Sequence, residues 1–487
     1  MKVGDSVELT IEALGFEGAS IARVDGLVVF VEGGLPGDHV RATIRSKKKS
    51  FVQATIDEVL VASSSRIAPR CSHTDMCGGC RWQHCDYATQ LAWKQQHTVD
   101  CFERLGKIPF GRINPIIPSP ETFHYRNKME FSFHDRRWVS AEELARGEEI
   151  LDRDFALGLH VPRRYDAIFT VDACHLQHDI GNVILRHVRE QALALGVSPY
   201  STKRKQGFLR HLVIRRSVAG NEFMIVLISS TPETPDEQAF SSWFIDTLPG
   251  LVPEACTMVH AVKDITNPVA RGAIRAVNGN GYITETVHDV AFRISPFSFF
   301  QTNSYQLHGF LDAIIAAACI DGTSVVWDLY CGTGSITLPA ARHARHVLGI
   351  ELSEESIDDA RHNAERNGIG NVSFTAADLH KAQTIEFLGR QERPDVVILD
   401  PPRAGIHPML LQHLMTLRVP RIVYVSCNPA TQARDCALLH EAYDVECMQA
   451  VDMFPHTYHV ENIATLVLRG GPAPADVVAV NPLRVRP

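Results

Sequence analysis

Two residues in the C-terminal half of the sequence could act together in covalent catalysis. Cys427 ends a strand-like run in VSCNPAT, and Glu461 precedes another run in HVENIATLVL. A cysteine at a strand end is well placed to act as a nucleophile, whereas a structural cysteine more often lies within a strand. Glu461 is a candidate base, although a carboxylate at the start of a strand can also simply face solvent. Cys331 is a second possible nucleophile, but it lies in a glycine loop, where it would contact a cofactor.

Acidic residues near the ends of other strand-like runs favour a bound nucleoside. The stretch VVWDLYCGTGSITL, from Val325 to Leu338, predicts a strand, a glycine loop and the start of a helix, which lets backbone approach a nucleotide-like ligand. Glu351 ends the next run, where a carboxylate can accept hydrogen bonds from ribose hydroxyls. Asp378 could orient an adenine amino group, and Asp400 ends a further run. Each of the three could instead cap a helix, but together they favour an adenosine-containing ligand. No lysine follows the glycines, which argues against a P-loop.

Three of the 12 cysteines have the spacing of a metal site. Cys71, Cys77 and Cys80 follow the pattern C-x5-C-x2-C, and the two glycines between the last two allow the backbone to wrap closely. Closed sulfur sites need a fourth ligand, for which Cys85 and Cys174 are both candidates. The spacing separates neither these two cysteines nor zinc from an iron–sulfur cluster. Disulfides are not expected in a chain that shows no leader.

The elements that position the catalytic and nucleoside-binding residues alternate between strands and helices. That alternation predicts an α/β fold with a doubly wound, Rossmann-like parallel sheet, in which ligands bind outside the carboxyl ends of the strands. The predicted strands cover residues 325–330, 346–352, 371–378, 395–403 and 421–429.

The N-terminal 62 residues predict a small barrel. Five short alternating runs punctuated by glycine are typical of an OB-type barrel, and the run LVVFVEGGLPGDHV resembles the TRAM domain, an RNA-binding barrel. A generic barrel without a ligand is the alternative, against which the lysine loop at residues 47–49 argues. Helical spacing over residues 86–105 then predicts a docking helix.

The central part of the chain, to about residue 290, predicts a mixed α+β domain. Strands are expected at residues 128–134, 156–161, 209–217 and 222–230, and a helix at residues 179–195. Basic residues on the strand HLVIRRS, together with Tyr125, Arg126 and Lys128, would suit stacking on exposed bases and binding of phosphates.

Composition sets broad limits on partners and location. The chain has 487 residues, so several domains are expected, and its net charge of −8 argues mildly against nucleic acid. Two local runs argue the other way, because residues 41–49 hold five basic side chains and residues 203–216 hold six, with no acidic residue in either. The start of the chain has no apolar leader and no run is long enough to span a membrane, so we expect a cytoplasmic protein.

The motifs, taken in order, resemble one known family. GGLPGD, CGGC, HYRNK, LRHLVIR, FFQTN, DLYCGTG, DPPR, SCNPAT and HVEN follow the order found in S-adenosylmethionine-dependent RNA uracil-5-methyltransferases. The resemblance covers nearly the whole chain. It is to the branch with a TRAM domain and a [4Fe–4S] cluster, whose members mainly modify 23S ribosomal RNA.

That resemblance implies a role for each candidate residue. The implied cluster ligands are Cys71, Cys77, Cys80 and Cys174. The implied S-adenosylmethionine contacts are Gln301, Tyr330, Glu351 and Asp400, with Asp378 as a further candidate. Cys427 would add to carbon 6 of uracil, and Glu461 would remove the proton from carbon 5. The helix after the cluster motif would pack on the catalytic domain.

These expectations lead to a domain layout and to rival functions. We expect a TRAM barrel at residues 1–62, an iron–sulfur and RNA-binding domain at 63–290, a methyltransferase domain at 291–470 and a loose tail at 471–487, in a monomer. A tRNA uracil-5-methyltransferase, an RNA cytosine-5-methyltransferase and a non-catalytic RNA-binding assembly factor are the alternatives. The glutamate in HVEN argues against the cytosine enzyme, and the presence of both Cys427 and Glu461 argues against the non-catalytic factor.

Overall fold

The computed structural model describes residues 1–147, 153–162, 164, 166–252, 254–267 and 269–470. It divides into two compact units, each discontinuous in sequence. The first unit contains Met1–Trp93, Glu121–Ile283 and Phe454–Tyr458, and the second contains Lys94–Pro120, Thr284–Met453 and the chain from His459. The predicted three-domain layout stays a prediction, and the expected loose tail at 471–487 lies outside the described residues.

The first unit begins with a six-stranded barrel-like sheet. Its order is β1-β5-β6-β4-β3-β2, with β4 and β6 parallel and the other pairs antiparallel. Alternate residues of the strands face a core that includes Val29, Val40 and Val52. The strands are β1 (Ser6–Thr10), β2 (Ala13–Leu14), β3 (Ser20–Val24), β4 (Leu27–Glu32), β5 (His39–Lys47) and β6 (Phe51–Val61).

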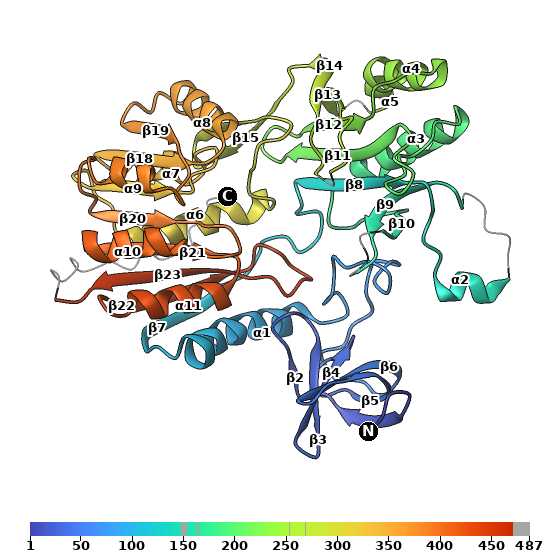
Figure 1. The fold of residues 1–487 in the computed structure, drawn as a ribbon, viewed down its shortest axis with the longest axis horizontal. Helices are drawn as coiled ribbons and strands as arrows, with labels where there is room; N and C mark the ends of the chain where they lie inside the picture. Colours follow the sequence, from blue (N-terminus) through green and yellow to red (C-terminus); the bar gives the residue numbers. More distant parts are fainter. Residues whose placement is uncertain (148–152, 163, 165, 253, 268, 471–487) are drawn as a thin grey trace, which may run out of the picture. The chain divides into compact units, whose positions relative to one another are not determined.

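A seven-stranded sheet forms the larger part of the first unit (Figure 1). Its order is β10-β9-β8-β11-β12-β13-β14, antiparallel except for the pair β12 and β13. The strands are β8 (Lys128–His134), β9 (Ala156–His160), β10 (Ile168–Thr170), β11 (Leu209–Ser217), β12 (Glu222–Ser229), β13 (Ala255–Val262) and β14 (Ala273–Gly279). The four strands expected from the sequence here are present at nearly the predicted bounds.

Helices cover this sheet through apolar stripes. In α3 (Asp179–Ala194), Ile184, Leu185, Val188 and Ala192 share one face and join the sheet's core, as the period of an α-helix requires. Capping boxes start two shorter helices, which are α2 (Ala141–Arg146) and α4 (Pro235–Ser242). A π-helical turn, η2 (Trp243–Thr247), and α5 (Leu248–Leu251) follow α4.

The short segment Phe454–Tyr458 is held firmly within the first unit. His456 has a left-handed backbone (φ 66°) and is 4% exposed. Its N–H donates to Gln90 Oε1 at 2.8 Å, and its carbonyl accepts from the Trp82 N–H at 2.9 Å. The Tyr125 hydroxyl donates to the Pro455 carbonyl at 3.1 Å. Three hydrogen bonds to buried residues therefore fix this segment.

The second unit is built on an eight-stranded sheet of order β19-β18-β17-β20-β21-β23-β22-β7. The first five strands in this order, β19, β18, β17, β20 and β21, are parallel to one another. Strand β23 is antiparallel to both its neighbours, and β7 is parallel to β22. The strands are β17 (Val325–Leu329), β18 (His346–Glu351), β19 (Val372–Ala376), β20 (Val396–Leu399), β21 (Arg421–Ser426), β22 (Tyr443–Val451), β23 (Glu461–Leu468) and β7 (Phe110–Ile117). This is the doubly wound sheet that the alternating pattern predicts.

Strand β17 lies where the chain order reverses, between β18 and β20. All five of its residues are buried, as in parallel strands covered on both faces. The covering helices are α6 (Ser304–Ala318), α7 (Thr337–Ala341), α8 (Glu354–Arg366), α9 (Ala382–Leu388), α10 (Pro408–Leu417) and α11 (Pro429–Leu439), and β15 (Ile283–Val287) pairs with β16 (Val290–Ile294). The carboxyl edge of the sheet at this reversal is where a ligand would bind.

The predicted docking helix forms, with a change of geometry near its end. Helix α1 spans Tyr87–Asp100 and continues as a π-helical turn, η1 (Cys101–Gly106). The part of α1 from Lys94 belongs to the second unit, as does β7. No helix among the described residues combines the length and apolar character needed to cross a membrane.

Candidate active site

The glycine loop after β17 brings a carboxylate against its backbone. Tyr330, Gly332 and Gly334 all have positive φ angles, of 73°, 54° and 84°. The loop therefore turns sharply, and its two glycines avoid the strain that Tyr330 accepts. Glu351, the last residue of β18, accepts hydrogen bonds from the Gly332 N–H at 3.3 Å and the Ser353 N–H at 3.0 Å. This arrangement presents the Glu351 carboxylate beside a loop able to admit a nucleoside.

The other predicted nucleoside contacts follow the neighbouring strands. Asp400 directly follows β20, and Gln301 Nε2 lies 3.5 Å from its Oδ2. Asp378 lies two residues beyond the end of β19, where its Oδ1 accepts from the His380 N–H at 2.9 Å. Asp378 therefore stabilises its own turn rather than capping α9, which begins at Ala382.

Cys427 occupies the turn between β21 and α11. The strand ends at Ser426, and Asn428 caps the helix by accepting from the Ala430 N–H at 3.2 Å. The thiol is partly exposed. Burial, followed by the negative charge of Glu461, raises the pKa of Cys427 to about 12, and Arg403 opposes both effects. The geometry thus leaves the sulfur accessible, while its surroundings favour the thiol form.

Glu461 is the first residue of β23 and is 5% exposed. Burial is the main reason why the pKa of Glu461 rises to about 8, with a further contribution from Asp400 and an opposing one from Arg403. The pKa of Asp400 rises to about 7, also chiefly through burial. The structure therefore brings Cys427 and Glu461 within electrostatic range of each other, of Asp400 and of Arg403.

Two residues that the sequence did not single out belong to this site. The Arg403 carbonyl accepts hydrogen bonds from Asn428 Nδ2 at 3.3 Å and Thr431 Oγ1 at 3.2 Å, so the start of α11 fixes the arginine beside Cys427. Asp328, in β17, is fully buried and accepts from Thr337 Oγ1 at 2.5 Å, and burial raises its pKa to about 7. Arg403 could have been identified from its place in the DPPR motif. Asp328 could have been identified as an acidic residue inside an apolar run.

An exposed aromatic ring lies next to the glycine loop. Phe299 is 60% exposed, and its carbonyl accepts from Thr333 Oγ1 at 3.4 Å. A Cβ atom added to Gly332 would lie 3.9 Å from the Phe299 ring. The motif FFQTN indicated this stretch, but the sequence could not show which of its two phenylalanines is exposed, and Phe300 is buried.

The four cysteines implied as cluster ligands come together in the first unit. Cys71, Cys77 and Cys174 each act electrostatically on Cys80, and burial is the main cause of the raised thiol pKa of Cys80. Backbone N–H groups point at two of the sulfurs, from Gly79 to Cys77 at 3.3 Å and from His73 to Cys71 at 3.4 Å.

Cys85, the other candidate fourth ligand, lies in an apolar cluster with Leu14, Leu35 and Trp82. Among the described residues, no group of three or more potential ligands has the geometry to hold a single metal ion. The four cysteines therefore lie near one another but do not have the geometry of a site for a single metal ion.

The predicted RNA-stacking surface on β11 is partly wrong. Arg210 and Arg215 are 6% and 2% exposed, and the Arg210 guanidinium stacks 3.6 Å from the Tyr200 ring centre. Tyr125 is also buried, at 1% exposure. Arg204 lies on the surface but pairs with Asp135 at 2.7 Å. Burial between the sheet and its covering segments thus removes several of these side chains from any contact with RNA.

Comparisons with known proteins agree with this geometry. A family model described as tRNA (Uracil-5-)-methyltransferase matches residues 273–469, and a TRAM domain model matches residues 1–56. The chain is 39% identical over 454 residues to an uncharacterized RNA methyltransferase of Bacteroides thetaiotaomicron, a match that covers 93% of this chain and 99% of that protein. A second uncharacterized RNA methyltransferase, from Chlorobaculum tepidum, is 38% identical over 467 residues. That match covers 95% of this chain and 96% of the other protein.

A solved structure is similar over nearly the same span. The crystal structure of Pyrococcus abyssi tRNA (uracil-54, C5)-methyltransferase, in complex with S-adenosyl-L-homocysteine, has a TM-score of 0.71 and 26% sequence identity. The match covers 95% of this chain and 100% of that one.

Proposed function

Because the chain belongs to the uracil-5-methyltransferase family of S-adenosylmethionine-dependent RNA methyltransferases, we propose that it methylates carbon 5 of a specific uridine in 23S ribosomal RNA through a covalent cysteine adduct. The observation that carries this proposal is the placement of Cys427 and Glu461 on adjacent strands, because Ser426, just before Cys427, pairs with Asn462, just after Glu461. Both lie at the edge of the sheet that also bears the glycine loop. A nucleophile, a base and a nucleoside-binding loop then serve one reaction.

The first proposed step is addition of the Cys427 sulfur to carbon 6 of the uracil ring. Carbon 5 of uracil is a poor nucleophile, and a bond from sulfur to carbon 6 gives an enolate that can take up a methyl group. Arg403 is the group that lowers the thiol pKa, so it favours the reactive thiolate. S-adenosylmethionine would supply the methyl group, bound by Gln301, Tyr330, Glu351, Asp378 and Asp400.

The second proposed step is removal of the carbon 5 proton by Glu461. A pKa near 8 makes this carboxylate a stronger base than an exposed glutamate, and the value lies close to a neutral working pH. Once the proton has left, the bond from carbon 6 to sulfur breaks and releases Cys427. Because stacked bases hide carbons 5 and 6, the target uridine would be flipped out of its helix.

We also propose that Cys71, Cys77, Cys80 and Cys174 bind a [4Fe–4S] cluster. The set fits because it consists of four soft ligands, and because the N–H groups of Gly79 and His73 would stabilise thiolates. The proposed methyl transfer requires no electron transfer, so the cluster's contribution would be to hold the loops that contain its ligands.

The choice of 23S rRNA rests on the TRAM barrel combined with the cysteine set. The exposed lysines 48 and 49 at the tip of the β5–β6 hairpin could contact phosphates. A tRNA substrate is the second candidate, since both the matching family model and the similar solved structure have tRNA enzymes as their subject. We place the reaction in the cytoplasm and expect a monomer to perform it.

One pair of variants tests the mechanism. We expect Cys427→Ala to bind S-adenosylmethionine but to lose methyl transfer at least a thousandfold, because no enolate can form. Glu461→Gln should instead accumulate an RNA adduct that withstands denaturant, seen as a shifted band on a denaturing gel. Incubation of the purified protein with 23S rRNA and with tRNA, followed by mass mapping of 5-methyluridine, identifies the substrate. Full activity of Cys427→Ala would refute the covalent route.

A further inference from the structure

A fully buried ion pair lies beside the strand that begins with Glu461. Lys94 Nζ, on α1, is 2.6 Å from Asp452 Oδ1, and both side chains have 0% exposure. Both residues belong to the second unit. Desolvation of two charges costs more than such a pair commonly returns, so a pair of apolar side chains would stabilise the fold as well or better. Stability alone therefore does not account for this pair.

The position of Asp452 suggests another role. Glu461 pairs across the antiparallel ladder with Val451, and Asp452 is the next residue. The Asp452 N–H donates to the Ile117 carbonyl at the end of β7, at 2.9 Å. Val451 therefore fixes the position of the Glu461 backbone. Its neighbour Asp452 is held by α1, through Lys94, and by the end of β7, through the Ile117 carbonyl.

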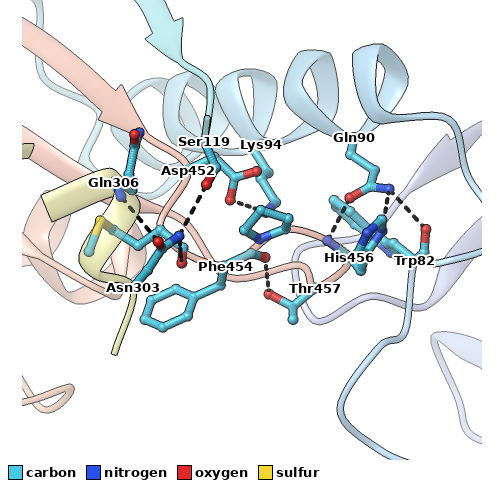
Figure 2. A network of polar contacts seen from close by, with 12 residues as sticks. Trp82, Gln90, Lys94, Ser119, Asn303, Gln306, Asp452, Phe454, His456 and Thr457 are labelled. Carbon is cyan, nitrogen blue, oxygen red and sulfur yellow. Dashed lines mark hydrogen bonds and ion pairs between the residues drawn. The ribbon is translucent and has the colours of Figure 1, made fainter. Parts of the chain in front are cut away.

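A second polar group holds the same strand end (Figure 2). Asn303 Nδ2 donates to the Met453 carbonyl and to Ser119 Oγ, both at 3.1 Å. Its Oδ1 accepts from the Gln306 N–H at 3.1 Å and so caps α6. The end of β22 is therefore fixed from α1, from β7 and from the start of α6, all within the second unit.

Neither Lys94 nor Asp452 is among the groups that shift the pKa of Glu461. The groups that shift its ionisation are Asp400 and Arg403, after burial itself. An influence of Lys94 on Glu461 must then pass through the position of the strands.

We propose that Lys94 and Asp452 are positioning residues that hold the Glu461 carboxylate where it can remove the carbon 5 proton. This inference rests on the proposed function of Glu461 as the base. The buried pair would then affect only the breakdown of the covalent adduct, in which the carbon 5 proton leaves and Cys427 is released. It would not affect the attack by Cys427.

The test replaces the pair by apolar side chains of similar size, Lys94→Met with Asp452→Leu. In single-turnover reactions with substrate RNA, we expect the adduct to form at the normal rate but to persist at least tenfold longer than in the unmodified protein. Ser229→Ala is the matched control, because it removes a buried hydrogen bond to His260 (2.8 Å) in the first unit. Its adduct lifetime should stay normal whatever its melting temperature.

The possible outcomes distinguish failure of this inference from failure of the proposed role of Glu461 as the base. A normal adduct lifetime in the folded double variant overturns the inference, while Glu461→Gln in the same assay still reports on the base. If Glu461→Gln also fails to prolong the adduct, the proposed function fails instead. If the apolar pair does not fold, the amide pair Lys94→Gln with Asp452→Asn replaces it, and a normal lifetime there overturns the inference equally.

Discussion

At the scale of single residues, Glu461 makes stability depend on pH. Its pKa is raised from 4.5 to about 8 by burial, so between these values the folded protein holds a proton that the unfolded chain has released. The contribution of Glu461 to stability is therefore lost as pH rises through this window. We expect Glu461→Gln to be more stable than the unmodified protein at pH 8, by about 1–3 kcal/mol, and to gain nothing at pH 4. Thermal unfolding at both pH values checks this, and equal shifts would contradict it.

At the scale of elements, the sequence predicted the bounds of the strands better than it predicted how their side chains pack. The run LRHLVIRRS predicted β11 at its observed bounds, because the β-branched residues Val213 and Ile214 favour a strand locally. It could not show that Arg210 stacks on Tyr200, since that contact depends on segments packed from elsewhere. Strand β7 was missed because Pro115 interrupts it and its partner, β22, lies far along the chain. An edge position tolerates such a proline.

The places of the two candidate catalytic residues were easier to predict than their electrostatics. Cys427 and Glu461 stand at strand ends, and strand order alone brings such ends to one edge. The burial of Glu461 depends on tertiary packing, which no local pattern records.

Helix α1 gives a prediction of its own at this scale. Lys94→Met leaves the Asp452 carboxylate without its ammonium partner in a fully buried place. We expect a loss of about 3–5 kcal/mol in the unfolding free energy of the second unit. Hydrogen exchange of the β22 and β23 amides measures that loss locally. The reference is Lys128→Met in the first unit, whose ion pair with Glu130 is partly exposed and whose loss should leave exchange of the β22 and β23 amides unchanged.

At the scale of the whole molecule, the two units depend on different chemistry. The first gathers the four cysteines, and the second holds the proposed reaction site. We expect Cys80→Ser to lose bound iron and brown colour after anaerobic purification, because a cluster needs all four thiolates. Cys319→Ser, at an exposed cysteine, should keep both. Iron analysis checks the pair, and absence of iron from the unmodified protein would refute the cluster.

The three buried carboxyl groups toward the carboxyl edge of the sheet also hold protons near neutral pH. Asp328 and Asp400 have pKa values near 7 and Glu461 near 8, so near neutral pH a substantial share of these groups is protonated. S-adenosylmethionine carries a sulfonium cation, which favours the ionised carboxylates and so drives protons into solution. The heat of cofactor binding should accordingly differ between buffers of different ionisation enthalpy, and a calorimeter would count the protons released.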